Sequence, residues 1–184
     1  MNFLGTHDTP RILTLLGSSY TPDSRDDRAA YRLSAEERAL GKKRLTLAAM
    51  LLYTFPGSPT LYYGDEAGME GFEDPFNRGT YPWGRTDETL LFLYRRLGEL
   101  RANRPSLQAG EISYLAADGG LLIYRRFLPD EETLVLLNAS NESRTVALPY
   151  GGTMATDAVT QQRFLVRSGQ LQVTLPPVGG MILI

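Results

Sequence analysis

The chain has no cysteine and a single histidine, His7, among its 184 residues. Disulfide bonds, thiolate metal sites and a thiol nucleophile are therefore excluded. One histidine also cannot build a metal centre of several imidazoles. Because the absence of cysteine fits oxidising and reducing compartments alike, it leaves the location of the protein open.

Long apolar runs and an excess of charge of one sign are also missing. No apolar stretch approaches the ~20 residues that are needed to span a bilayer. The formal net charge is −2, and acidic and basic residues are mixed along the chain. This balance gives no electrostatic footprint for nucleic acid or for an anionic membrane, so neither is expected as a partner.

The first strand is expected at residues 1–4, followed by a short helix at 11–16 and a polar surface loop at 16–32. Since this strand starts without a lead-in, we expect the natural N-terminus to lie upstream, with Met1 an internal residue or an artificial start. The absence of a signal peptide then carries little weight.

A longer helix is predicted from Ser34 to about Tyr53. Ser34 and Glu37 have the spacing of a capping box, in which each side chain satisfies a backbone N–H at the helix start. Residues 45–52 are apolar on nearly every face, which indicates a buried C-terminal end. The segment 55–59, Phe-Pro-Gly-Ser-Pro, ends the helix.

The next segments alternate strand, loop and helix. Residues 60–63 are β-prone, and residues 64–85 form a long loop, which in compact domains is usually functional. Thr86 is expected to cap a second helix that ends near Asn103. Its apolar stripe consists of Leu90, Leu93, Tyr94, Leu97 and Leu100.

After this helix the apolar period changes from 3.6 to 2, which predicts an antiparallel β-sandwich. Residues 118–120 and 168–169 are predicted hairpin turns. We place the domain boundary at 104–110, giving domains 1–104 and 105–184. The expected strands are 112–115, 121–127, 133–138, 144–148, 162–166, 170–175 and 181–184.

The order of elements before this boundary is βαβα, which requires a parallel sheet with helical cover. Two strands cannot supply such a sheet alone, so this half is expected to be a piece of something larger.

Thr6-His7-Asp8 follows the first strand directly, where a parallel barrel places its active-site groups. A carboxylate beside an imidazole can hydrogen-bond sugar hydroxyls or stabilise developing positive charge. The alternative is that Asp8 caps the turn at Arg11 and His7 packs beside it.

The long loop offers two kinds of side chain. Four carboxylates could suggest calcium, but their spacing differs from the calcium-loop pattern, and a solvated acidic loop with internal ion pairs is the preferred interpretation. They are Asp65, Glu66, Glu73 and Asp74. Asp74 and Arg78 could instead accept and donate hydrogen bonds to sugar hydroxyls. The aromatic residues Tyr62, Tyr63, Tyr81 and Trp83 could stack on sugar rings, although Tyr62 and Tyr63 alternate on the expected strand, so one of them should be core.

Three segments together resemble the α-amylase family of glycoside hydrolases. Residues 2–11 resemble the motif that ends in His-Asp after the seventh barrel strand, and residues 55–69 resemble the eighth-strand region. Residues 74–83 are similar to the adjoining loop of the neopullulanase and cyclomaltodextrinase branch. The resemblance implies a C-terminal piece of a (β/α)8 barrel, its last two strand–helix units, followed by an antiparallel β-sandwich domain.

The resemblance also implies roles for four residues. Asp8 would be the third catalytic carboxylate, which binds ring hydroxyls and favours the distorted, oxocarbenium-like sugar, and His7 would hydrogen-bond the same sugar. Asp74 and Arg78 would bind a glucose unit farther toward the non-reducing end. Thr6 departs from the Asn that is frequent in the wider family, although small hydroxyl residues also occur there in this branch.

The resemblance implies hydrolysis of α-1,4-glucosidic bonds in maltooligosaccharides, cyclomaltodextrins or pullulan. No organic cofactor is implied, the residues build no calcium site, and the relatives of this branch favour a cytoplasmic location. The chain alone should be inactive, since the nucleophile and the acid/base of a retaining glycosidase would lie upstream. It should also self-associate through the exposed barrel edge. A related glucan transglycosylase or trehalose-active enzyme, and a non-catalytic carbohydrate-binding module, are the alternative functions.

Overall fold

The structure, a computed structural model, describes residues 1–184 and divides into two compact units. Unit 1 contains Met1–Leu52 and Gly57–Arg95, and unit 2 contains Tyr53–Pro56 and Arg96–Ile184. The expected division into domains 1–104 and 105–184 stays a prediction.

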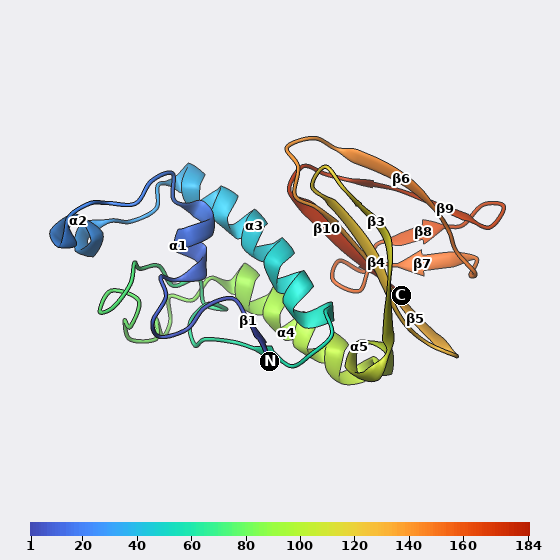
Figure 1. The fold of residues 1–184 in the computed structure, drawn as a ribbon, viewed down its shortest axis with the longest axis horizontal. Helices are drawn as coiled ribbons and strands as arrows, with labels where there is room; N and C mark the ends of the chain where they lie inside the picture. Colours follow the sequence, from blue (N-terminus) through green and yellow to red (C-terminus); the bar gives the residue numbers. More distant parts are fainter. The chain divides into compact units, whose positions relative to one another are not determined.

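Unit 1 is built on a pair of parallel strands, β1 (Asn2–Phe3) and β2 (Pro59–Thr60), with Asn2 opposite Pro59. The parallel pairing agrees with the βαβα order read from the sequence. The helices of the first half are α1 (Ile12–Gly17), α2 (Arg25–Ala30), α3 (Ala35–Thr54) and α4 (Glu88–Asn103) (Figure 1). None of the helices is both long and apolar enough to cross a membrane.

The expected capping box starts α3. The Ser34 N–H donates to Glu37 Oε2 at 2.9 Å, and the Glu37 N–H donates to Ser34 Oγ at 3.2 Å. At the start of α4 the predicted cap was wrong by one residue. Asp87, and not Thr86, accepts the N–H of Leu90, at 3.3 Å.

The core of unit 1 lies where α1, α3 and α4 meet. Its buried members are Ile12, Leu13, Leu45 and Leu90. Helices α1 and α3 approach closely because two glycines face each other, and a Cβ built on Gly41 would lie 2.9 Å from Gly17 Cα. This packing places the segments that follow β1 and β2 on a common scaffold.

Two expectations for unit 1 are corrected. The segment 16–32, expected as loop, contains α2, whose N-cap Ser24 Oγ accepts the Asp27 N–H at 3.0 Å. The expected strand 60–63 is only Pro59–Thr60, because the chain turns at Tyr62, whose carbonyl accepts the Asp65 N–H at 3.2 Å. The following Gly64 has φ +88°, a conformation that favours glycine.

Unit 2 contains the antiparallel strands of the expected sandwich, arranged as a four-stranded sheet of order β10-β5-β4-β3 and the pairs β6-β9 and β7-β8. The strands are β3 (Glu111–Asp118), β4 (Leu121–Leu128), β5 (Glu131–Asn138), β6 (Arg144–Pro149), β7 (Met154–Thr156), β8 (Arg163–Leu165), β9 (Gln170–Leu175) and β10 (Gly179–Leu183). Side chains from the sheets share one core, in which Leu136, Leu171 and Leu183 are fully buried. The predicted alternation along β9 is confirmed, since its apolar residues are buried and its polar ones exposed.

Two elements of unit 2 were not expected. The helix α5 (Pro105–Ala109) occupies the segment read as a domain boundary, with Pro105 in its first turn. The second unexpected element is the strand β7, which pairs with β8 through Ala155 and Phe164.

Candidate active site

The four residues singled out from the sequence come together in unit 1. His7 and Asp8 follow β1, and Asp74 and Arg78 lie in the loop after β2. Arg78 Nη2 lies 3.4 Å from Asp8 Oδ1, and Arg78 Nε lies 3.1 Å from Asp74 Oδ1. His7 Nε2 lies 3.2 Å from the other Asp8 oxygen, Oδ2. One guanidinium therefore bridges two carboxylates, and an imidazole completes the cluster.

This cluster is open to solvent. The side chains of Asp8 and His7 are 71% and 65% exposed, and those of Asp74 and Arg78 are about half exposed. Exposed ion pairs contribute little to stability, about 0–1 kcal/mol each. Their donors and acceptors can therefore exchange partners for a polyhydroxylated ligand at low cost.

A residue that the sequence did not single out, Asn77, holds the backbone on both sides of Asp8. Its side-chain amide donates to the carbonyls of His7 and Thr9, at 2.7 Å each. Asn77 is fully buried, and its side-chain oxygen has no partner. The bonds fix Asp8 relative to the loop that carries Arg78.

Arg11 is also fully buried, and it connects the segment after β1 with the loop after β2. Its Nε donates to the Asn77 carbonyl at 2.7 Å, and its Nη1 donates to Asp65 Oδ1 at 3.2 Å and to the Tyr63 carbonyl. In the sequence, Arg11 stands out only as an arginine directly before an apolar helix. The partners that account for its burial lie more than 50 residues away in the chain.

The tyrosine pair differs from expectation. Neither Tyr62 nor Tyr63 belongs to the core, because Tyr62 is half-buried and Tyr63 is 41% exposed. The guanidinium of Arg11 lies over both rings, 4.3 and 4.7 Å from their centroids. Cation–π contact therefore helps to hold the buried charge of Arg11.

The acidic side chains of the long loop have partners within the chain, as expected of internal ion pairs. Asp65 pairs with Arg11, Glu73 with Arg28 and Asp74 with Arg78. Glu66 instead accepts the Gly64 N–H at 2.8 Å. Burial raises the pKa of the Asp65 carboxyl to about 6, against the opposing effect of Arg11.

A carboxylate, an imidazole and a guanidinium lie together at the carboxyl ends of parallel strands, where a (β/α)8 barrel carries its active site, and antiparallel β-sheets follow in the chain. Residues 1–96 match the family model described as alpha amylase, catalytic domain, and residues 112–182 match that described as maltogenic amylase, C-terminal domain. The chain belongs to the α-amylase family. These matches confirm the expected fold, a C-terminal piece of the (β/α)8 barrel followed by a β-sandwich.

Curated relatives are matched along nearly the whole chain. It is 34% identical to an amylopullulanase of Thermoanaerobacter thermohydrosulfuricus, over 100% of this chain and 13% of that protein. It is 32% identical to neopullulanase 2 of Thermoactinomyces vulgaris and 31% identical to a cyclomaltodextrinase of Geobacillus thermopakistaniensis. These two matches cover 99% and 97% of this chain and 28% of each relative. The chain thus spans less than a third of the length of these relatives.

Solved structures show the same fold. An α-amylase of Anoxybacillus superposes with a TM-score of 0.78 at 28% identity, over 98% of this chain and 36% of that one. An acarbose-soaked debranching enzyme of Nostoc punctiforme superposes with a TM-score of 0.68 at 26% identity, over 99% and 33%.

Proposed function

We propose that these residues are part of a retaining glycoside hydrolase that cleaves α-1,4-glucosidic bonds of maltooligosaccharides, cyclomaltodextrins or pullulan. The observation that carries the proposal is the cluster of His7, Asp8, Asp74 and Arg78 at the carboxyl ends of parallel strands. Support comes from the relatives named cyclomaltodextrinase and neopullulanase and from the acarbose-soaked debranching enzyme.

Asp8 is assigned as the catalytic carboxylate that binds ring hydroxyls and stabilises the oxocarbenium-like sugar in the transition state. His7 binds the same sugar. Asp74 and Arg78 bind a glucose unit farther toward the non-reducing end. An exposed carboxylate and guanidinium suit this task, since together they accept from and donate to vicinal hydroxyls.

The chain alone is expected to be inactive. A retaining glycosidase needs a nucleophile and an acid/base carboxylate about 5–5.5 Å apart, flanking the scissile bond. The carboxylate that shares this cluster with Asp8 is Asp74, and Arg78 lies between them. Asp8 and Asp74 both pair with Arg78 and are assigned to sugar binding and charge stabilisation, so this cluster itself supplies neither the nucleophile nor the acid/base.

The test is reducing-sugar release from a cyclomaltodextrin by a longer protein that contains this chain, comparing wild type with Asp8→Asn. We expect the substitution to lower kcat at least about a hundredfold, because it removes charge stabilisation of the transition state. Asp26→Asn, an exposed aspartate of α2, is the matched control and should retain activity.

Each result bears on a different part of the proposal. Activity that survives the Asp8 change would refute the catalytic assignment. A wild type that releases no reducing sugar but lengthens maltooligosaccharides would identify a transglycosylase instead. A wild type without either activity would favour a non-catalytic carbohydrate-binding role.

A further inference from the structure

The loop after the cluster presents an aromatic pair that has no part in the site described so far. The rings of Tyr81 and Trp83 lie 4.6 Å apart at an angle of 51°. Trp83 is 83% exposed and is the only tryptophan of the chain. Burying the apolar surface of an indole ring is favourable, and this ring is exposed to water. Trp83 is therefore a candidate for contact with a ligand.

The pair is held in a defined geometry. The Trp83 N–H donates to the Tyr81 carbonyl, and the Arg85 N–H donates to the Pro82 carbonyl, at 2.9 Å each. These bonds form a tight turn around Pro82, whose ring fixes the backbone further. Tyr81 is half-buried, and burial together with the neighbouring Glu66 raises the pKa of its hydroxyl. The half-buried tyrosine ring thus packs against the exposed indole and helps to hold it in place.

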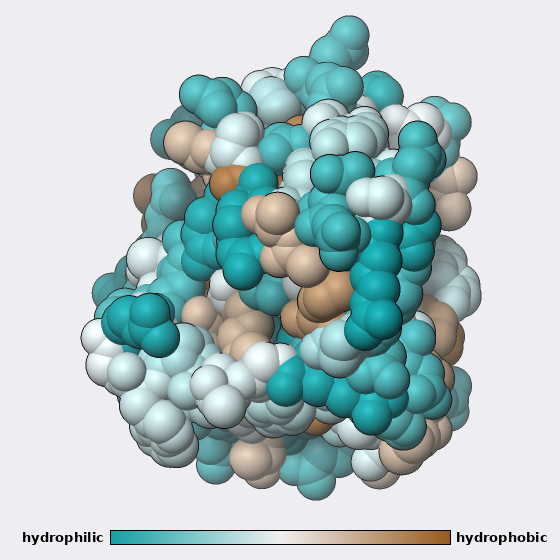
Figure 2. Space-filling view, turned by 90° about the vertical axis from the view of Figure 1, so that its left-hand side faces the viewer, coloured by the Kyte–Doolittle hydropathy of each residue, from teal (hydrophilic) through white to brown (hydrophobic).

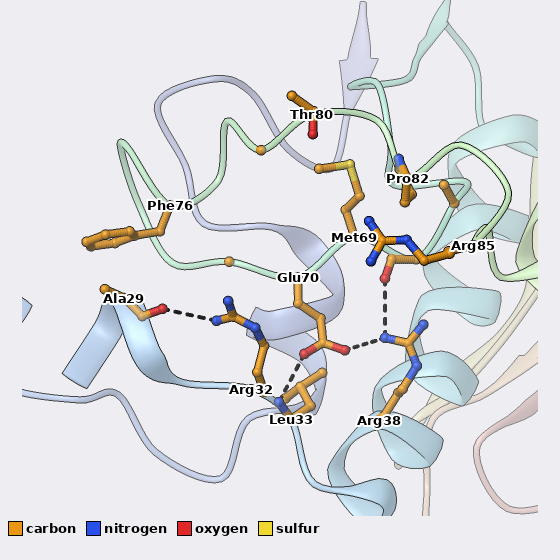
Figure 3. A pocket seen from close by; sticks show the side chains of 14 residues that line it. Ala29, Arg32, Leu33, Arg38, Met69, Glu70, Phe76, Thr80, Pro82 and Arg85 are labelled. Atoms are coloured by element: carbon orange, nitrogen blue, oxygen red, sulfur yellow. Dashed lines mark hydrogen bonds and ion pairs between the residues drawn. The ribbon is translucent and has the colours of Figure 1, made fainter. Parts of the chain in front are cut away.

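Beside this turn lies a hollow of about 540 Å³, within the size range of small-molecule sites. Figure 3 shows Thr80, Pro82 and Arg85 on one side of it. Glu70, on the floor of the hollow, is already bonded to Arg38 and to the Leu33 N–H. The guanidinium of Arg85 has no partner in the structure, so its donors are free for a ligand. Figure 2 shows the left-hand side of the molecule in Figure 1, where hydrophilic residues surround recessed apolar ones.

The turn also lies within reach of the candidate active site. Trp83 is five residues after Arg78, and five residues span at most about 18 Å when fully extended. This separation is no greater than the length of an oligosaccharide of several glucose units.

We infer that Trp83, backed by Tyr81 and flanked by Thr80 and Arg85, forms an outer subsite for an α-glucan chain, which rests on the function proposed above. The flat face of the indole packs against the C–H groups of a glucose ring. The Thr80 hydroxyl and the Arg85 guanidinium bond the hydroxyls of that unit or of its neighbour.

The test uses the chain itself and maltoheptaose, with Trp83 fluorescence and calorimetry as readouts. We expect a saturable change of Trp83 emission, and this change should persist in Arg78→Ala, which weakens only the inner contacts. Trp83→Ala should bind about two- to tenfold more weakly than Trp83→Phe by calorimetry, as expected for one aromatic contact. Phe92→Ala, which removes an exposed aromatic ring on α4, is the matched control and should bind like wild type.

Two results would overturn the subsite. One is binding by calorimetry without any change of Trp83 emission, or with equal affinity in the alanine and phenylalanine variants. The other is the absence of maltoheptaose binding at millimolar concentration. Neither result bears on the proposed hydrolase activity, because the Asp8→Asn experiment on the longer protein tests that activity separately.

Discussion

At the scale of single residues, the groups that would touch a sugar are exposed, and the groups that hold them are buried. Asn77 and Arg11 have almost no accessible surface, yet they connect the residues after β1 with the loop after β2. Buried polar groups of this kind are costly to disturb, because a donor or acceptor left without a partner loses its hydration as well. The geometry around Asp8 therefore depends on residues that the ligand does not meet.

Asn77→Asp tests this dependence with almost no change in volume. The substitution replaces two amide donors with a carboxylate that faces the carbonyls of His7 and Thr9. We expect a loss of about 2–4 kcal/mol in the free energy of unfolding, from two broken hydrogen bonds and a second buried side-chain oxygen without a partner. Urea denaturation measures this loss. His7, the only histidine, gives a single set of imidazole NMR signals that should shift.

Asn103→Asp is the matched control for that experiment. Asn103 is exposed at the end of α4, where its amide donates one bond to the Glu99 carbonyl at 2.8 Å. Its substitution should change stability by less than about 0.5 kcal/mol. If Asn77→Asp proved as mild as this control, with unmoved His7 signals, the positioning role of Asn77 would be refuted.

Sequence patterns identified some of these residues and missed others, because only some of them have a local signal. His7 and Asp8 were singled out because they follow a strand directly, and Asp74 and Arg78 because they could bond sugar hydroxyls from a polar loop. Their roles were inferred only from the resemblance to the α-amylase family. Asn77 and Arg11 gave no local signal, since the partners that explain them are 52 to 70 residues away in the chain. Hydrogen bonds between residues so far apart in the chain form only in the folded protein and leave no local pattern in the sequence.

At the scale of elements, local rules placed the long helices and the short helix α1 well but missed α2 and α5. The capping box of Ser34 and Glu37 was predicted because both partners lie within one turn. The helix α2 was missed because none of its residues is buried, so it has no apolar stripe. The helix α5 was missed because residues 104–110 were read as a domain boundary, although the proline in this segment is favoured in the first turn of a helix.

Asp87 joins two helices of unit 1 and makes their packing sensitive to acid. It caps α4 through the Leu90 N–H and accepts from Lys42 Nζ at 2.9 Å and Arg38 Nη2 at 3.2 Å, both on α3. Burial acts to raise the pKa of Asp87, but the hydrogen bonds from Lys42, Thr89 and Leu90 outweigh it and hold this pKa well below its usual value.

The sign of the pH effect follows from that shift. Because the folded-state pKa lies below the unfolded value of about 3.9, the stabilisation by Asp87 is present above pH 4 and is lost as the pH falls. Asn keeps an oxygen that can cap α4, but it removes the negative charge that accepts hydrogen bonds from Lys42 and Arg38. Asp87→Asn should therefore cost about 1–2 kcal/mol at pH 7, in the range of hydrogen bonds to a charged group, and progressively less below pH 4. Thermal unfolding at pH 7 and pH 3 measures the difference.

Glu88→Gln serves as the control for this pH dependence. Glu88 is the next acid in the chain, is exposed and accepts from Thr86 within its own helix start. Its substitution should have a small effect at both pH values. An Asp87→Asn variant whose deficit is the same at pH 3 and pH 7 would contradict the role given to the ionised carboxylate.

At the scale of the whole molecule, the parallel strand pair of unit 1 leaves strand edges without a partner beside exposed apolar residues. The strands β1 and β2 form a sheet of two, so each has an edge without a partner strand. Met1, Phe3 and Leu61 beside these edges are exposed, Phe3 by 52% of its surface. A hollow of about 190 Å³ with a largely apolar lining lies among them. Open edges next to apolar surface favour association with another chain.

We propose that the chain alone self-associates through this edge. Light scattering at tens of micromolar, on the order of the concentrations at which such surfaces associate, should give a mass above that of the monomer. Phe3→Glu should shift the mass toward the monomer, because a charge on the apolar edge opposes association. Phe92→Glu places the same charge on an exposed position of α4 and should leave the mass unchanged. A strict monomer in the wild type would refute the proposal, and an equal effect of both substitutions would move the contact away from β1.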